Sequence, residues 1–224
     1  MKPRSLLFRG SIIALALGFV WWQRHQTESV TVAPPSSDSP APSATAEKNR
    51  YGYEVWKGCQ LIEDEGNDGD SFVVRHGSER VVMRLYFVDA PESYLSDRHE
   101  SQQRRVREQA ADLGGLTDEQ TVAIGKKAKE MTRSWMRAGD FTVLTYREPV
   151  YEGDRFYGFV TLSDGRDLGE SLISEGLVRI HTKGPGSKEK PVATPEGKAF
   201  YPYRDELRRL EKTAQSSKQG AWGE

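Results

Sequence analysis

The fold is decided by residues 68–92, which read DGDSFVVRHGSERVVMRLYFVDAPE. Residues 71–75 and 80–88 are rich in β-branched and apolar side chains, and the turn between them contains a glycine, a pattern typical of a β-hairpin. A similar extended run at residues 53–62 precedes them. Three successive antiparallel strands predict the start of a small β-barrel.

Charged residues flank this hairpin in the sequence. Asp70 opens the second strand, Asp89 follows the third strand, and Glu92 lies three residues later. Pairing of the two strands would bring both Asp carboxylates near a backbone carbonyl, a hard oxygen site suited to Ca²⁺. Arg84 lies five residues before Asp89, so it shares this site only if the strand bends. The simpler alternative is a plain Asp-Gly-Asp turn.

The rest of the chain mixes helical and extended patterns. Residues 100–113 have helical composition, and Thr117 with Gln120 forms a capping box that opens a helix reaching about residue 138. Beyond it the patterns predict two strands, a short helix and a last helix, at residues 141–146, 156–162, 168–176 and 202–220. The sequence therefore predicts an α+β fold with a mainly β core and packed helices.

The composition excludes several kinds of site. The chain has 224 residues with one Cys and four His, so an intramolecular disulfide and a Cys-rich zinc site are excluded and a His-based metal cluster is not expected. Residues 51–224 carry 26 Lys and Arg against 30 Asp and Glu, a net charge of −4. A net-acidic domain argues against sequence-independent coating of DNA, although a local basic cleft is compatible with it.

The first 25 residues predict a signal peptide or a signal anchor. Three basic residues precede an apolar run at residues 11–22, which is the order found in export signals. The two tryptophans that end the run favour an uncleaved anchor. Residues 26–50 are rich in Pro, Ser and Ala and predict a disordered linker. The folded domain is expected over residues 51–224, either secreted or membrane-anchored outside the cytoplasm.

Two motifs at fixed spacing, Asp68-Gly-Asp-Ser71 and Arg84-Leu-Tyr-Phe-Val-Asp-Ala-Pro-Glu92, resemble the core pattern of the staphylococcal (thermonuclease-like) nuclease family. The resemblance continues through Asp154-Arg-Phe-Tyr-Gly-Phe-Val160 and ends with Gly220-Ala-Trp222. It implies an OB-fold, a five-stranded barrel with packed helices. It also implies Ca²⁺-dependent hydrolysis of phosphodiester bonds in DNA, with RNA as a second substrate.

The resemblance assigns the acidic residues of the motifs to metal binding and to water activation. Asp70 and Asp89 are the implied carboxylate ligands of Ca²⁺, and the carbonyl oxygen of Ala90 assists them. Glu92 is the implied group that takes a proton from the attacking water or orients it. The backbone of Pro91 is stiff and would hold Glu92 in place.

The resemblance also implies two arginines that clamp the phosphate. Arg84 is the first. Arg155 is the candidate for the second, although it lies one place off an ungapped alignment with the family. A planar guanidinium binds two oxygens of one phosphate, which a lysine cannot do. Tyr157 and Tyr151 are candidates for contact with the nucleotide.

The family resemblance implies no role for two polar segments. A basic stretch at residues 98–107 lies in an insertion-like segment, residues 93–116, and a loop at residues 181–198 carries four lysines. We interpret the first as a solvated helix with charge pairs, with a nucleic-acid-facing patch as the alternative, and the second as a mobile loop, with contact to a substrate strand as the alternative.

Two other functions stay open. The same barrel could bind nucleic acid or protein without hydrolysis, and it would then show no turnover with any divalent metal. A structural domain whose polar cluster only closes a barrel end would lose stability alone when Asp70 or Arg84 is replaced by Ala. The motif set favours a nuclease that acts on DNA or RNA as a monomer.

Overall fold

The structure is a computed structural model that describes residues 47–96, 98–151, 154–181 and 183–224. The predicted signal segment (residues 1–25) and most of the predicted linker lie outside these residues. The described part begins with Glu47, whose carboxylate pairs with Lys57 at 2.9 Å. Within this part of the chain, no helix has the length and apolar character needed to cross a membrane.

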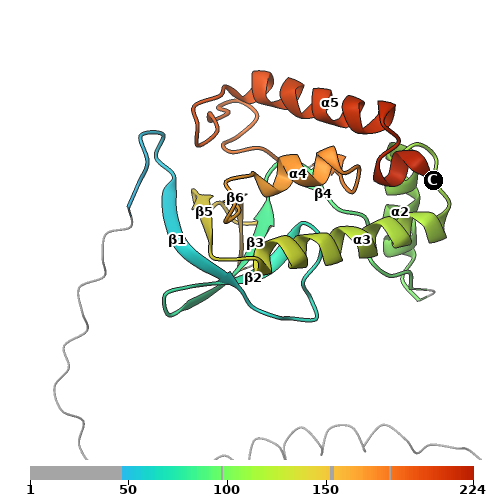
Figure 1. The fold of residues 1–224 in the computed structure, drawn as a ribbon, viewed down its shortest axis with the longest axis horizontal. Helices are drawn as coiled ribbons and strands as arrows, with labels where there is room; N and C mark the ends of the chain where they lie inside the picture. The colour runs from blue at the N-terminus through green and yellow to red at the C-terminus, as the bar shows by residue number, and fades with distance from the viewer. Residues whose placement is uncertain (1–46, 97, 152–153, 182) are drawn as a thin grey trace, which may run out of the picture. The chain divides into compact units, whose positions relative to one another are not determined.

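In the described residues, five strands close into a barrel in the order β1-β2-β3-β6-β5. Neighbouring strands are antiparallel except for β3 and β6, which are parallel. A separate two-stranded sheet pairs β4 with β7. The strands are β1 (Glu54–Leu61), β2 (Ser71–His76), β3 (Glu79–Leu85), β4 (Val88–Asp89), β5 (Phe141–Thr145), β6 (Arg155–Thr161) and β7 (Arg179–Ile180). The predicted antiparallel meander and the α+β barrel fold are confirmed (Figure 1).

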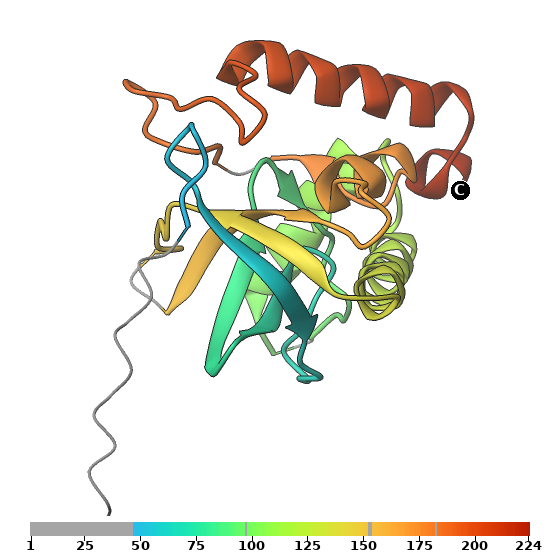
Figure 2. The same cartoon turned by 60° about the vertical axis from the view of Figure 1, so that its left-hand side comes forward.

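Helices pack around this barrel, and α4 lies between the barrel and α5 in both views (Figures 1 and 2). The helical elements are α2 (Glu100–Asp112), α3 (Asp118–Arg137), α4 (Leu168–Ser174), α5 (Phe200–Ser216) and the 3₁₀ turn η1 (Gly220–Gly223). The predicted capping box at the start of α3 is present, because the Thr117 hydroxyl accepts from the Gln120 amide and the Gln120 side chain accepts from the Thr117 amide.

The strand predicted at residues 80–88 is wrong in its last part. β3 ends at Leu85, and the chain then leaves the barrel. Phe87 has φ of 66°, a left-handed conformation that bulky residues rarely adopt. Its ring lies 5.2 Å from the rings of Phe200 and of Tyr203 in α5. The strand therefore breaks because this aromatic side chain packs beneath the last helix and not inside the barrel.

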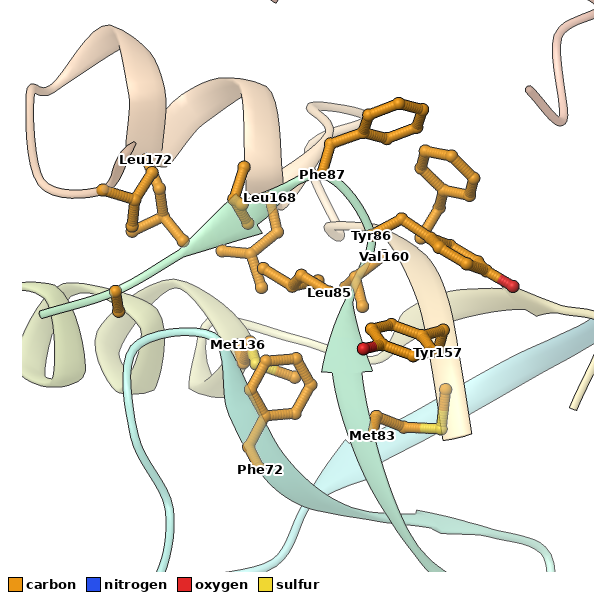
Figure 3. Packing of buried hydrophobic residues seen from close by; sticks show 14 of the residues in the cluster. Phe72, Met83, Leu85, Tyr86, Phe87, Met136, Tyr157, Val160, Leu168 and Leu172 are labelled. Carbon is orange, nitrogen blue, oxygen red and sulfur yellow. The ribbon is translucent and has the colours of Figure 1, made fainter. Parts of the chain in front are cut away.

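The core joins the barrel to α3 and α4. Met136 of α3 lies beside Phe72 of β2, and Leu168 and Leu172 of α4 lie near Leu85 of β3 (Figure 3). All five side chains are almost fully buried. Each contributes about 1.5–3 kcal/mol by leaving water. This packing fixes the ends of β2 and β3, which carry the polar residues singled out by the sequence.

Asp167 caps the N-terminus of α4 with a half-buried carboxylate. Its Oδ1 accepts from the Glu170 amide at 2.9 Å. Burial raises the pKa of Asp167 from 3.8 to about 7, and the negative charges of Glu170 and Glu196 add to the rise. Because the pKa is higher in the folded state, the stability that protonation provides is complete below about pH 4 and is lost as the pH rises to about 7.

The variant Asp167→Asn should therefore become more stable than the wild type as the pH rises. Asn keeps the capping oxygen without the charge. We expect equal free energies of unfolding near pH 4 and a gain of up to about 4 kcal/mol at pH 8, measured by urea denaturation. The exposed turn variant Asp164→Asn should show no such gain. A difference that stays constant between pH 4 and pH 7 would show that Asp167 does not titrate in this range.

Candidate active site

All eight residues that the sequence singled out line one cleft of about 750 Å³. They come from β2–β4, from β6 and from the loops next to these strands. They are Asp70, Arg84, Asp89, Ala90, Glu92, Tyr151, Arg155 and Tyr157. The structure thus brings together two groups of residues that lie far apart in the sequence.

The hairpin of β2 and β3 sets Asp70 beside Arg84. Ser71 pairs with Arg84 across the hairpin, and the Asp70 carbonyl accepts from the Leu85 amide at 2.9 Å. As a result, Nη2 of Arg84 lies 3.0 Å from Oδ2 of Asp70. The strand pairing that the sequence predicted is confirmed.

The break after β3 brings Asp89 to the same place. Oδ1 of Asp89 lies 2.6 Å from Nη2 of Arg84, and the Ala90 amide donates to Oδ2 of Asp70 at 2.8 Å. The sequence argument required a bend between Arg84 and Asp89, and the left-handed residue Phe87 lies between them. One guanidinium therefore bridges the carboxylate of Asp70, directly before β2, and that of Asp89 in β4.

The positive charge of Arg84 is stabilised by the carboxylates of this cluster, which repel each other. Burial raises the pKa of the Asp70 carboxyl, Arg84 opposes the rise and Asp89 adds to it. Burial lowers the pKa of the Arg84 guanidinium, but the charges of Asp70 and Asp89 outweigh this effect and raise it. Arg84 therefore stays positively charged over the physiological pH range.

Helix α2 contacts the carboxylate of Glu92. Nε of Arg105 lies 2.9 Å from Oε1 of Glu92, and Nε2 of Gln102 donates to Oε2 at 3.3 Å. Arg104, by contrast, makes an exposed pair with Glu108 at 3.9 Å, as expected for a solvated helix face. The insertion-like segment at residues 93–116 thus holds Glu92 in the cleft with one of its helix faces.

Gln109 of α2 is a site residue that the sequence reasoning missed. It is 3% exposed. Its Nε2 donates to Oδ2 of Asp89 and to the Ala90 carbonyl, both at 3.2 Å. Its Oε1 accepts from the Glu92 amide at 3.0 Å. One buried amide therefore connects three of the predicted site residues.

A signal for the two glutamines is present in the sequence. Gln102, Val106, Gln109 and Leu113 follow one another at steps of four, three and four residues, so they share one face of a helix. Val106 and Leu113 are fully buried. Glutamines on an apolar face require buried partners, and those partners are the backbone and carboxylates of the cleft.

Replacing Gln109 by Ala should destabilise the fold. The variant leaves the Ala90 carbonyl and the Glu92 amide without their side-chain partner, at a cost of about 1–3 kcal/mol for unsatisfied buried groups. Chemical denaturation measures this as a lower free energy of unfolding. Arg107→Ala on the exposed face of the same helix should change stability by less than about 0.5 kcal/mol. Equal effects of the two variants would mean that the Gln109 contacts contribute nothing.

Arg179 of β7 is a second residue that was missed. Its Nη2 lies 2.9 Å from Oδ2 of Asp89 and its Nη1 lies 2.5 Å from Oδ2 of Asp112. The pairing of β4 with β7 places Asp89 opposite Arg179. Arg84 and Arg179 thus hold one oxygen each of the Asp89 carboxylate. The sequence signal is a single charge within the apolar segment at residues 177–180.

Arg155 lines the same cleft as Arg84. The parallel pairing of β6 with β3 sets Tyr157 opposite Arg84 and Arg155 opposite Val82. Residues at i and i+2 of a strand share a face, so Arg155 faces the same way as Tyr157. Among the residues that the structure describes, Arg155 makes no ion pair, in contrast to Arg84 and Arg179. Its charge is available to a bound anion.

The two tyrosines differ in their exposure. Tyr157 is only 7% exposed, and its ring stacks on Tyr86 with centroids 5.3 Å apart. Tyr151 is 86% exposed. Tyr157 therefore forms a wall of the cleft, whereas Tyr151 presents a free ring at its edge.

The cleft offers oxygen donors of the kind that Ca²⁺ binds. The carboxylates of Asp70, Asp89 and Glu92 line it together with Ala90, and such hard oxygens fit Ca²⁺ in kind. The guanidinium of Arg84 contacts both Asp70 and Asp89, so it competes with a cation for the same oxygens. In the described ranges, no group of three or more His, Cys, Asp or Glu side chains is arranged to hold a metal ion.

A family model matches most of the folded part of the chain. The family described as "Staphylococcal nuclease homologue" matches residues 82–224. This range includes Arg84, Asp89 and Glu92 and extends to the end of the chain. No curated protein matches the sequence.

Proposed function

Because the chain belongs to the staphylococcal nuclease family, we propose that it is a nuclease. The family match covers residues 82–224. The proposed reaction is hydrolysis of phosphodiester bonds in DNA, and in RNA as a second substrate, with Ca²⁺ as cofactor. The observation that carries this proposal is that Arg84, Arg155 and Glu92 line one cleft with two buried aspartates.

The two arginines stabilise the charge that builds up on the phosphate. An attacking water forms a five-coordinate arrangement whose equatorial oxygens gather negative charge. Planar guanidinium groups donate two hydrogen bonds each to such oxygens. Arg155 has no ion pair among the described residues, and Arg84 carries a charge that its buried carboxylates maintain. Electrostatic stabilisation of this kind is commonly the largest single contribution to catalysis.

Glu92 acts as the general base in this proposal. A carboxylate with two oxygens accepts more than the two hydrogen bonds that Arg105 and Gln102 donate. An acceptor position is therefore left for the proton of the attacking water. The contacts from α2 fix the direction of the carboxylate, which proton transfer requires.

Asp70, Asp89 and the Ala90 carbonyl are the residues that would hold Ca²⁺. When bound, the cation would neutralise negative charge on the phosphate. Gln109 and Arg179 keep the Asp89 carboxylate in a fixed orientation. Loss of such support from neighbouring side chains typically lowers metal affinity by about 10–100-fold.

The test of this function is cleavage of a labelled single-stranded DNA by the full-length protein. We expect cleavage with Ca²⁺ and loss of cleavage with a chelator, restored when Ca²⁺ is added in excess. RNA of matched sequence tests the second substrate. Absence of cleavage with every divalent cation supplied would contradict the proposed activity.

A binding module without hydrolysis is the alternative function. It is favoured by one observation, the bridge that Arg84 makes between Asp70 and Asp89. If this bridge persisted with substrate present, neither a cation nor the phosphate would reach its implied ligands. The alternative would be supported by DNA binding that survives chelation together with no turnover.

We also propose that the protein acts outside the cytoplasm, held by or released from its N-terminal apolar segment. The sequence order of basic residues and apolar run at residues 1–25 supports this. Protease added to intact cells or to spheroplasts should degrade the folded domain. Full protection until the membrane is lysed would contradict this location.

A further inference from the structure

A second hollow of about 540 Å³ adjoins the cleft, between the chain after β7 and the first turns of α5. This region lies at the N-terminal end of α5 (Figure 2). We call it the basic groove and define it by five lining residues, Lys183, Lys188, Phe200, Tyr201 and Arg204. Three of them are cations, and no acidic residue lines the hollow. The groove therefore has the charge that attracts an anion.

Two of the three cations of the groove are available to a ligand, whereas Lys183 pairs with Glu148 at 3.2 Å. Within the described part of the chain, neither Lys188 nor Arg204 makes an ion pair. Lys198 and Arg208, which lie next to this region, are instead paired with Glu206 and Asp205 at 2.7 and 2.8 Å. The charges of Lys188 and Arg204 are thus not neutralised by an acidic partner, on a domain that is acidic as a whole.

The groove also contains an exposed aromatic ring, that of Tyr201, which packs on side chains anchored in the core. Tyr201 is 65% exposed. The ring of Phe200 lies edge-on to it at 5.1 Å and packs on Phe87 at 5.2 Å. Phe87 itself is buried in the core. A supported and exposed aromatic ring next to cations is the combination with which proteins bind single-stranded nucleic acid.

Lys183 connects the groove with the cleft, since it lines both hollows. Its Nζ lies 6.0 Å from the ring centroid of Tyr157 in the cleft wall. It also donates to the Gly186 carbonyl at 2.9 Å in the groove. A chain of phosphates that leaves the cleft past Lys183 therefore enters the groove directly.

We propose that the basic groove binds the part of a single-stranded nucleic acid that extends beyond the cleaved phosphate, an inference that rests on the proposed nuclease function. Lys183, Lys188 and Arg204 contact backbone phosphates, and Tyr201 stacks on a base. The strand is single because an exposed ring stacks on a base face only where that base is unpaired. Recognition by these groups does not depend on base sequence.

The test compares a long and a short ligand in the absence of metal. Full-length wild type and the double variant Lys188→Gln, Arg204→Gln are titrated with fluorescent oligothymidylates of about 12 nucleotides and of about three. We expect the variant to bind the long ligand roughly tenfold more weakly at low salt and its salt dependence to fall by about 1.4 in slope, since each lost phosphate contact contributes about 0.7. Affinity for the short ligand should stay within about twofold.

The double variant Arg209→Gln, Lys212→Gln is the matched control, because it removes two exposed cations from α5 outside the groove. It should leave the affinity for both ligands nearly unchanged. Equal losses in the control and in the groove variant, or equal losses for long and short ligands, would overturn the proposal. Tyr201→Leu should weaken binding of the long ligand by at least about fivefold. If this variant binds the long ligand as tightly as the wild type, Tyr201 does not stack on a base.

Cleavage by the wild type, measured in parallel, separates the two claims. If the wild type cleaves DNA and the groove variant binds the long ligand as the wild type does, the groove proposal fails and the nuclease function stands. If the wild type cleaves nothing but only the groove variant loses affinity for the long ligand, the nuclease function fails and the groove stands as a nucleic-acid-binding site.

Discussion

Replacing Glu92 by Gln should reduce cleavage of single-stranded DNA by about 10²–10⁴-fold, the usual contribution of a positioned general base. Gln has the same shape, and its one carbonyl oxygen can still accept the hydrogen bond from Arg105, so the fold should persist. The carboxamide cannot take a proton from water. Single-turnover cleavage at saturating protein measures the chemical step, and thermal denaturation checks the fold.

Glu108→Gln is the control for this variant. Glu108 lines the same cleft and is exposed, with a long ion pair to Arg104 at 3.9 Å. Its substitution removes the same charge from the same hollow and should change the rate by less than about threefold. If Glu92→Gln cleaves as fast as Glu108→Gln, Glu92 is not the base.

Replacing Arg84 by Lys should reduce the cleavage rate by about 10²–10³-fold, as expected when one electrostatic donor to the transition state is removed. The guanidinium contacts Asp70 and Asp89 together at 3.0 and 2.6 Å, and a single ammonium cannot reach both carboxylates and a phosphate. The free energy of unfolding should also fall, by about 1–3 kcal/mol. Rates are compared at a temperature at which both proteins are folded.

Arg80→Lys provides the matched control in the same strand. Arg80 is exposed and pairs with Asp64 at 2.5 Å, away from the cleft. Its conservative substitution should leave both rate and stability nearly unchanged, since exposed ion pairs contribute little. If the role of Arg84 were only structural, Arg84→Lys would lower stability but leave the cleavage rate of the folded protein unchanged.

The hairpin and its charged ends could be predicted because local patterns determine them. The apolar and β-branched runs at residues 71–75 and 80–88 around a glycine turn predicted the hairpin, in which Ser71 pairs with Arg84. That pairing alone places Asp70 next to Arg84. The capping box at Thr117 was likewise readable, since it depends on residues three positions apart.

Contacts between distant segments could not be read in the same way. The break at Phe87 depends on aromatic residues of α5, more than a hundred positions later in the chain. The contacts of Arg179 with Asp89 arise from a two-residue strand whose partner no local pattern identifies. The helical spacing of α2 places Gln109 on its apolar face, but the groups that Gln109 binds become evident only when α2 is placed against the cleft.

The basic groove could not be predicted from the sequence either, because its cations come from two separate segments. The polar composition of the loop at residues 181–198 predicts a mobile segment, with contact to a substrate strand as the alternative. The structure sets Lys183 and Lys188 beside Tyr201 and Arg204 of α5. A cluster of cations around an exposed ring is visible only after the loop and the helix are brought together.

The most direct test of the proposed active site is a crystal structure of the protein grown with Ca²⁺ and thymidine bisphosphate. We expect a phosphate between the guanidinium groups of Arg84 and Arg155, and a cation on Asp70 and Asp89, with Arg84 released from at least one carboxylate. A bisphosphate bound outside the cleft, or Arg84 still bridging both carboxylates with no phosphate beside it, would contradict the account.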